Sequence, residues 1–306
     1  MKKALITGIN GQDGSYLASF LLDKGYEVWG TLKRNSVAEN QTVRIEHIFD
    51  RLNLEYCDVT DLASIIRVVS KVRPDEIYHL AAQSHVRISF DQPIYTANAT
   101  GLGVLNLIEA VREINPKIKI YQASSSEMFG NSVDADGFQR ETTPMHPVSP
   151  YGCAKVFGYN IVRNYRNAYK LHASNGILFN HESPRRGSNF VTNKVVKSAV
   201  EIKLGILDKL ELGNMDAYRD WGHSYDYVRA MWMMLQQPEP DDYVIATGET
   251  HTVQEFVEIA FGHAGLNWEE HVKLDPKFIR PAEVDLLIGD PAKAKQELGW
   301  EPSIDF

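Results

Sequence analysis

The sequence predicts an α/β fold in which a doubly wound, parallel sheet is joined by a smaller, discontinuous C-terminal α/β lobe. Two observations predict this fold. Short apolar segments alternate with longer amphipathic segments from residue 2 to residue 180, and such alternation is typical of a parallel sheet covered by helices on both faces. In addition, the glycine-rich turn "TGINGQDG" joins the first apolar segment to the first amphipathic one.

The expected elements follow in chain order. Strands are predicted at residues 2–8, 26–32, 54–61, 76–82, 118–125 and 172–180, which are rich in apolar, β-branched and aromatic residues. Helices are predicted at residues 15–25, 62–72, 95–114 and 150–169, where apolar residues recur with helical periodicity. Beyond residue 180 the pattern changes to a polar loop, a helix at 191–204, strands at 210–214 and 241–249, and a helix at 252–265.

The composition excludes several classes of function. The 306 residues carry a formal net charge of -8, whereas non-specific nucleic-acid binders are usually basic, so no nucleic-acid partner is expected. No apolar run approaches the ~20 residues of a membrane helix, so no membrane partner is expected. Cys57 and Cys153 are too few for a disulfide framework, and the ten histidines show no metal-ligand pattern. A cytoplasmic protein without a metal site is therefore expected.

The glycine-rich turn predicts a dinucleotide site, with a turn that binds nothing as the alternative. Its glycines follow a strand and open a helix, so the backbone can approach a pyrophosphate at the positive helix N-terminus. The expected cradle comprises Gly8, Asn10, Gly11, Gln12, Asp13 and Gly14. Residues 1–177 and 216–246 are then expected to form a Rossmann domain that binds the dinucleotide. Residues 178–215 and 247–306 are expected to form the substrate lobe.

The end of the second strand predicts which dinucleotide binds. NAD-binding proteins usually carry Asp or Glu here to bond the ribose 2′-hydroxyl. This sequence instead has Lys33, Arg34, Asn35 and Ser36. Cations at this place attract a 2′-phosphate, so NADP is the expected cofactor, with a solvated basic loop as the alternative. After the third strand, Asp58 and Val59 are expected beside the adenine ring.

The segment "ASSSEMFG" places a hydroxyl and a carboxylate at the end of a predicted strand. Serine is an ordinary residue at a strand end, but glutamate is less ordinary there. Because Ser125 and Glu127 are two residues apart, alternation along a strand would point both side chains to one face. The pair is therefore a candidate catalytic group.

The segment "SPYGCAK" places Tyr151 and Lys155 one turn apart on one face of a predicted helix. Ser149 is expected to cap this helix, and Pro150 suits its first position. A free tyrosine is a poor base at neutral pH. A nearby ammonium favours the phenolate and so lowers the pKa of Tyr151, which could then remove a hydroxyl proton. A surface pair without chemistry is the alternative.

Taken together, these motifs resemble the extended short-chain dehydrogenase/reductase family, whose marks are TGxxGxxG, a serine after the fifth strand and YxxxK. Longer segments between Thr7 and Gly299 resemble the GDP-mannose 4,6-dehydratases within it. These segments include "AAQSHVRISFDQP", "YQASSSEMFG", "NGILFNHESPRRGSNFVT" and "RPAEVD". Many members have a longer segment before "RPAEVD" and continue into a final helix near where this sequence ends.

The resemblance implies a hydro-lyase that removes water from GDP-D-mannose to give GDP-4-keto-6-deoxy-D-mannose, with NADP as a transient hydride carrier. Tyr151 would take the proton of the sugar 4-hydroxyl, and Ser125 would bond the 4-oxygen. Lys155 would also bind the nicotinamide ribose. Glu127 would remove the C5 proton and help to expel the C6 hydroxyl as water.

The resemblance also implies contacts to cofactor and substrate. The cofactor contacts would include Leu80, Ala81, Ala82, Gln83, Ser84, Tyr95, Tyr151, Lys155, His181 and Arg186. The substrate contacts would include Ser84, Ser125, Glu127, Asn180, Val191, Lys194, Arg219, Arg280 and Glu283. Two arginines and a lysine suit a diphosphate, and a glutamate could accept from a ribose hydroxyl or the base. Surface ion pairs are the alternative for Arg186 and Arg219, and a hydrogen-bonded loop histidine without a ligand is the alternative for His181.

Two competing functions use the same motifs. An NDP-sugar 4-epimerase or 4-keto-sugar reductase needs the Ser, Tyr and Lys but no acid at position 127, so Glu127 speaks against it. A non-catalytic NADP-binding sensor needs neither Tyr151 nor Lys155, yet both are present. The resemblance further implies a homodimer or homotetramer, in which the loop at residues 35–47 reaches a neighbouring cofactor site.

Overall fold

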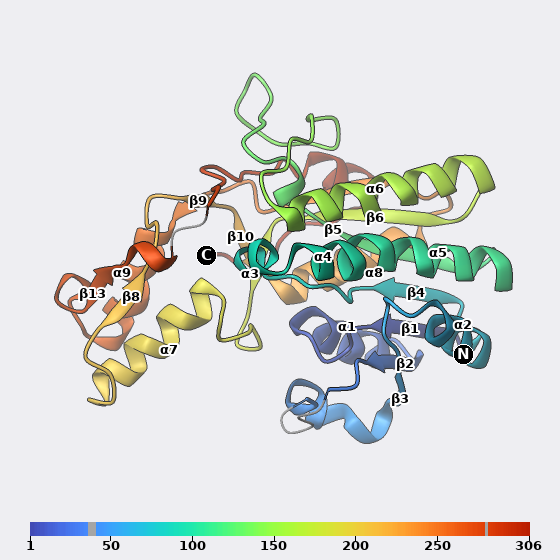
Figure 1. The fold of residues 1–306 in the computed structure, drawn as a ribbon, viewed down its shortest axis with the longest axis horizontal. Helices are drawn as coiled ribbons and strands as arrows, with labels where there is room; N and C mark the ends of the chain where they lie inside the picture. Colours follow the sequence, from blue (N-terminus) through green and yellow to red (C-terminus); the bar gives the residue numbers. More distant parts are fainter. Residues whose placement is uncertain (36–40, 279–280) are drawn as a thin grey trace.

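A seven-stranded parallel sheet forms the centre of the computed structural model, which describes residues 1–35, 41–278 and 281–306 (Figure 1). The strand order is β11-β6-β5-β4-β1-β2-β3. The strands are β1 (Lys3–Thr7), β2 (Glu27–Leu32), β3 (Asn53–Tyr56), β4 (Glu76–His79), β5 (Lys119–Ser125), β6 (Ala173–Leu178) and β11 (Asp242–Ile245). The predicted doubly wound α/β fold is therefore confirmed.

Helices cover both faces of the sheet. One face carries α1 (Gln12–Asp23) and α8 (Ser224–Gln236), and the other carries α2 (Leu62–Val72), α5 (Gly103–Ile114) and α6 (Pro150–Tyr169). The first strand shows why its sequence is apolar throughout. Ala4 and Ile6 lie in the core beneath α1 and α8, whereas Leu5 lies in the core beneath α2, α5 and α6. Alternate side chains of a strand point to opposite faces, and here both faces are buried.

Several elements differ from the sequence-based expectation. The helix predicted at 95–114 is α4 (Pro93–Thr96), a π-helical segment η2 (Ala97–Leu102) and α5 in succession. Helix α1 begins at Gln12 rather than residue 15, because the glycine turn leads directly into it. The sequence analysis did not identify α8, α3 (Val86–Asp91) or the 3₁₀ segment η1 (Val43–Arg51).

The C-terminal lobe has its own apolar core, and Figure 1 shows α7, α9, β8 and β13 grouped at one end of the molecule. Its elements are α7 (Val191–Lys203), β8 (Leu210–Leu212), α9 (Val253–Ala264) and β13 (Val272–Leu274). Two small pairings join it to the rest of the chain, namely β7 (Asn180–Glu182) with β10 (Trp221–His223) and β9 (Tyr218–Arg219) with β12 (His251–Thr252). We propose that the cores on the two faces of the seven-stranded sheet belong to the dinucleotide domain, and that the separate core of the C-terminal lobe belongs to the substrate lobe.

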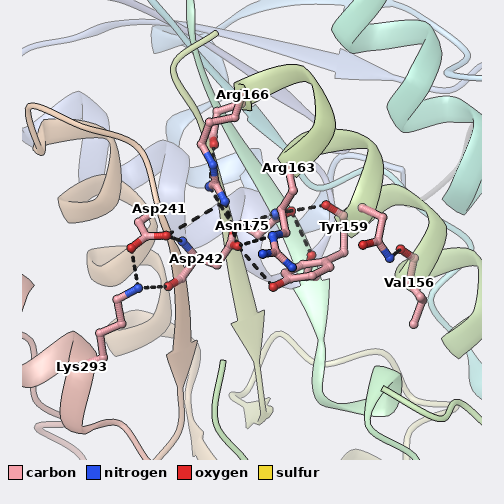
Figure 2. Close-up of polar contacts among 11 residues, drawn as sticks. Val156, Tyr159, Arg163, Arg166, Asn175, Asp241, Asp242 and Lys293 are labelled. Carbon is pink, nitrogen blue, oxygen red and sulfur yellow. Dashed lines mark hydrogen bonds and ion pairs between the residues drawn. The ribbon is translucent and has the colours of Figure 1, made fainter. Parts of the chain in front are cut away.

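A buried polar network fixes α6 to the edge of the sheet (Figure 2). The guanidinium of Arg166 donates two hydrogen bonds to the carboxylate of Asp242, at 2.9 and 2.8 Å. Asn175 of β6 donates to the same carboxylate at 2.8 Å, and Tyr159 of α6 donates at 3.2 Å. Lys293 adds a bond of 2.9 Å to the Asp242 carbonyl oxygen. The helix that carries Tyr151 is therefore tied to β6, β11 and the C-terminal segment.

A second buried network joins α1, β7 and α8 through the carboxylate of Asp13. Nε2 of His181 lies 2.8 Å from one oxygen of Asp13, and the hydroxyl of Ser224 donates to the other at 2.8 Å. Gln12 donates to the His181 carbonyl oxygen at 3.0 Å. The other ring nitrogen of His181 lies 2.7 Å from the carbonyl oxygen of Phe179. Both ring nitrogens thus face acceptors, which favours the doubly protonated imidazolium.

The pKa values of this pair agree with its geometry. Burial alone would raise the pKa of Asp13, but the charge and hydrogen bond of His181 outweigh burial and lower it to about 2. Burial alone would lower the pKa of His181, but Asp13 raises it above its ordinary 6.5. The stabilisation from Asp13 is therefore lost as pH falls below 3.8 towards 2, and the part from His181 is lost as pH rises above 6.5.

The substitution Asp13→Asn is expected to lower the free energy of unfolding most between pH 3.8 and 6.5, by about 3 kcal/mol, because it leaves a buried cation without its partner. The loss should shrink at higher pH as His181 becomes neutral. Urea unfolding of both proteins across this range measures the difference. Asp23→Asn, on the same helix but with a side chain 77% exposed, is the matched control. A loss for Asp13→Asn that does not change with pH would contradict the ion pair.

Candidate active site

The candidate site lies at the carboxyl edge of the sheet, where β1, β4, β5 and β6 end side by side. The parallel register aligns Thr7 with His79, and Ser125 with Leu178. Ligands of doubly wound folds bind at this edge. The turns that follow these strands carry most of the residues that the sequence analysis selected.

The turn after β1 fits the pyrophosphate of a dinucleotide. Gly8 has a positive φ of 71°, and a Cβ atom on Gly14 would lie 2.5 Å from the Gly8 carbonyl oxygen. Gly11 caps α1 without a side-chain hydrogen bond, so no side chain at the cap competes for the first N–H groups of the helix. Such N–H groups bind phosphate. Asn10 donates to the Gln41 carbonyl oxygen at 3.1 Å, which fixes the turn to the segment after β2.

Thr7, which was not among the predicted site residues, connects this turn to the segment after β4. Its hydroxyl accepts from the backbone N–H groups of Leu80 and Ala81, each at 3.1 Å, and lies 2.8 Å from Nδ1 of His79. The predicted cofactor segment at residues 80–84 is thereby placed beside the glycine turn. Gln83 is fixed by Thr100, whereas Ser84 is exposed. The position of Thr7 directly before Gly8, at the start of the glycine-rich turn, was the feature of the sequence that could have identified it.

The structure brings three predicted cofactor residues together at the end of β2. The ammonium of Lys33 donates to the hydroxyl of Tyr95 at 2.8 Å and lies 3.1 Å from the carboxylate of Asp58. Arg34 is exposed, and its guanidinium donates to the carbonyl oxygen of Asn35. Lys33 is thus already paired, which leaves Arg34 as the better candidate for an anionic ligand. Ser36 lies outside the described residues.

Val59 follows Asp58 and is buried at the base of this region. Its carbonyl oxygen accepts from Asn106 at 3.0 Å, and Gly103 packs so closely that an added Cβ atom would lie 3.0 Å from the Val59 side chain. The position predicted for an adenine contact is therefore rigidly held.

Ser125, Tyr151 and Lys155 converge where β5 meets the N-terminus of α6. Ser149 caps α6 by accepting from the Gly152 N–H at 3.0 Å, and Pro150 occupies the first position, as predicted. All three converging side chains are buried, and the hydroxyl of Ser125 lies close enough to the phenol of Tyr151 to lower its pKa. The site thus holds a hydroxyl and a phenol near each other, as a group that binds one substrate oxygen requires.

The prediction that Lys155 lowers the pKa of Tyr151 is wrong for this structure. Burial raises the pKa of Tyr151 to about 12, and the hydroxyl of Ser125 opposes burial only in part. The ammonium of Lys155 instead donates to the Ala123 carbonyl oxygen at 2.7 Å and lies 5.6 Å from the centroid of the Tyr151 ring. Burial lowers the pKa of Lys155 to about 8, so the lysine is still charged at neutral pH.

Glu127 lies beyond the end of β5 rather than on it. The strand ends at Ser125, and Ser126–Met128 form one 3₁₀ turn (η3), in which the Ser125 hydroxyl accepts from the Glu127 N–H at 3.3 Å. Alternation along a strand therefore does not apply to this pair. The carboxylate nevertheless acts on Tyr151: burial is the main cause of the raised pKa of the phenol, and the charge of Glu127 contributes to it. The Glu127 residue is only 8% exposed.

The segment "NHESPRRG" approaches this group from the other side. The side-chain oxygen of Asn180 is buried and has no hydrogen-bond partner among the described residues, as expected of a group that binds a ligand. His181 pairs with Asp13, as described above. Arg186 pairs with Glu182 at 3.1 Å, and its guanidinium lies 3.7 Å from the centroid of the Phe190 ring. The charge of Arg186 also acts on the pKa of Tyr151.

The predicted substrate residues of the lobe form two separate contacts. Arg219 is 7% exposed, and its guanidinium lies 3.0 Å from the Glu283 carboxylate. Lys194 donates to the Glu211 carbonyl oxygen at 2.5 Å and lies over the ring of Phe278. Val191 begins α7 and is half-buried. Arg280 lies outside the described residues.

The described residues contain neither a candidate metal site nor a candidate membrane-spanning helix. Within residues 1–35, 41–278 and 281–306, no group of three or more His, Cys, Asp or Glu side chains could hold a metal ion. No helix in the described part of the chain is long and apolar enough to cross a membrane.

The fold is shared with solved structures of other enzymes. UDP-glucose 4-epimerase of Thermotoga maritima, solved with UDP-glucose, is 26% identical with a TM-score of 0.86, covering 99% of this chain and 94% of that chain. The dTDP-glucose 4,6-dehydratase of Bacillus anthracis, solved with NAD, shows the same fold at 23% identity and a TM-score of 0.86, covering 100% of this chain and 93% of that one.

Sequence comparison gives a narrower result. GDP-mannose 4,6 dehydratase 1 of Arabidopsis thaliana is 53% identical, covering 100% of this chain and 86% of the relative. The human GDP-mannose 4,6 dehydratase is 52% identical, covering 99% of this chain and 88% of the relative. The model of the family described as GDP-mannose 4,6 dehydratase matches residues 5–306, and this chain therefore belongs to that family.

Proposed function

We propose that this chain is an NADP-dependent hydro-lyase that converts GDP-D-mannose to GDP-4-keto-6-deoxy-D-mannose. The observation that carries the proposal is the buried carboxylate of Glu127, one 3₁₀ turn beyond Ser125 and close enough to Tyr151 to influence its pKa. A simple dehydrogenase needs the serine, tyrosine and lysine but no acid beside them. Family membership and the relatives' names support the same reaction.

Tyr151 and Ser125 act on the sugar 4-hydroxyl in this proposal. The phenolic oxygen takes the hydroxyl proton, and the Ser125 hydroxyl donates a hydrogen bond to the sugar oxygen. With a pKa of about 12, Tyr151 holds its own proton at neutral pH, so substrate binding must bring positive charge closer to it. The candidate cations are Lys155, whose ammonium lies 5.6 Å from the centroid of the Tyr151 ring, and Arg186, whose charge lowers the pKa of the phenol.

Glu127 carries the step that distinguishes dehydration from oxidation. Once C4 is a ketone, the proton on C5 is acidic, and the carboxylate can remove it. The same carboxyl group then protonates the C6 hydroxyl, which leaves as water. A bound nicotinamide would accept the hydride from C4 and return it to C6. C5 would then take up one proton, which balances the proton that Tyr151 removed from the 4-hydroxyl.

The residues that would hold the cofactor are those of the glycine turn, the segment at 80–84 and the end of β2. The structures solved with NAD support a nicotinamide dinucleotide. Arg34 supports the choice of NADP, because an exposed guanidinium at this position suits a 2′-phosphate.

In the lobe, Lys194 and Arg219 would bind the diphosphate of the nucleotide sugar. We also propose a homodimer or homotetramer. Ile94, Leu102 and Phe157 support this assembly, because these apolar side chains are exposed on packed neighbouring helical segments. A cytoplasmic location is proposed because Cys57 and Cys153 are both free.

The reaction is tested by incubating the purified chain with GDP-mannose and a catalytic amount of NADP. The expected product has lost one water, carries a 4-keto group and forms without stoichiometric accumulation of NADPH. Mass spectrometry and proton NMR identify it, and Tyr151→Phe serves as the inactive control. A product of unchanged mass that is epimerised at C4 would favour the epimerase instead.

The cofactor is tested by measuring the dissociation constants of NADP and NAD by calorimetry. Arg34→Ala is expected to weaken NADP about 10-fold or more and to leave NAD within twofold, because a charge-assisted hydrogen bond contributes about 1.5–3 kcal/mol. Arg51→Ala, which removes an exposed cation from the end of η1, should change neither constant. Equal losses for NAD and NADP would contradict a 2′-phosphate contact.

A further inference from the structure

Asp220 occupies the point at which the chain passes from one small sheet to another. The residue before it, Arg219, ends β9, which pairs with β12. The residue after it, Trp221, begins β10, which pairs with β7 and stands opposite Asn180. Asp220 itself is fully buried. A buried carboxylate at a crossing between sheets requires a structural or functional reason.

The carboxylate of Asp220 accepts four hydrogen bonds from two other segments. One oxygen accepts from the Thr247 N–H at 2.8 Å and from the Thr247 hydroxyl at 2.7 Å. The other accepts from the N–H groups of Gly248 and Gly289, at 3.0 and 3.2 Å. Three of these donors belong to the backbone, so the carboxylate fixes the course of the chain after β11 and near residue 289.

The backbone at these donors is shaped to reach the carboxylate. A Cβ atom on Gly289 would lie 2.4 Å from the Ala246 side chain and 2.8 Å from the Phe179 ring. Only glycine therefore lets this segment approach closely enough to donate. Burial raises the pKa of Asp220 to about 6, while the four donors act in the opposite direction. At neutral pH the carboxylate is ionised, which makes it the stronger acceptor.

The segments beside Asp220 carry two groups of predicted site residues, namely those proposed to bind the nucleotide and those near Tyr151 and the glycine turn. Next to Asp220, Arg219 contacts Glu283, and the backbone N–H of Tyr218 donates to the Asp285 carbonyl oxygen at 2.8 Å. On the other side, β10 holds β7, which carries Asn180 and His181. Asp220 therefore helps to fix the distance between Arg219, a proposed diphosphate contact, and β7, which carries Asn180.

We propose that Asp220 is a positioning residue, which holds Arg219 and Glu283 in register with Asn180 and His181 so that the nucleotide end of the substrate is bound. This inference rests on the proposed function, because that function gives Arg219 and Glu283 their ligand. Asp220 does not touch the reacting atoms. Its loss is expected to weaken nucleotide binding and to leave the dinucleotide cradle of α1 unchanged.

The test is the substitution Asp220→Asn, with GDP and NADP as the probes in separate calorimetric titrations. Asparagine keeps the shape, but its NH₂ group replaces an acceptor and faces N–H donors. GDP is expected to bind about 10-fold more weakly, and NADP within twofold of wild type. Asp216→Asn, an exposed carboxylate in the same segment, is the matched control and should change neither constant.

A second variant keeps the proposal testable if Asp220→Asn does not fold. Thr247→Val removes only one of the four donors, and a smaller loss of GDP affinity, about threefold, is expected. Unchanged GDP affinity in a folded Asp220→Asn protein, or in Thr247→Val when the first variant is unfolded, would overturn the positioning role. Failure of the wild-type chain to bind GDP would instead refute the proposed substrate.

Discussion

The buried ion pair between Asp13 and His181 is the interaction on which the arrangement of the site depends. Asp13 stands in the first turn of α1, directly after the glycine turn, whereas His181 belongs to β7 and is 168 residues away in the chain. Ser224 joins the same carboxylate from α8. This junction is the charged part of the contact between the phosphate end of the cofactor site and the strand that carries Asn180, and Gln12 reinforces it by bonding His181 and Ser183.

The chemistry follows from what this junction and the parallel sheet bring together. β5 delivers Ser125 to the carboxyl edge, and the network around Asp242 holds α6 so that Tyr151 and Lys155 meet it. Glu127 follows Ser125 at once in a 3₁₀ turn. One short segment thus supplies both the hydroxyl that joins Tyr151 and Lys155 and an additional acid. The same fold can therefore support epimerisation without the acid or dehydration with it.

Local features were predictable from the sequence, and long-range ones were not. The glycine turn, the capping of α6 by Ser149 and the parallel sheet each depend on neighbouring residues or on a simple period, and all three are confirmed. The pKa of Tyr151 could not be predicted, because it depends on burial and on how Lys155 is turned towards Ala123. The bonds of Thr7 to Leu80 and of Asp220 to Gly289 join residues 73 and 69 positions apart, and no local pattern signals such contacts.

The variant Glu127→Gln tests whether Glu127 converts an oxidation site into a dehydration site. Product formation from GDP-mannose and exchange of the C5 hydrogen with deuterated solvent would be followed together by NMR, with GDP and NADP affinities measured on the same protein. Both product formation and C5 exchange are expected to fall by at least about 100-fold, in the range that acid–base groups contribute, while both affinities stay near wild type. Dehydration by Glu127→Gln at the wild-type rate would show that Glu127 does not have this role.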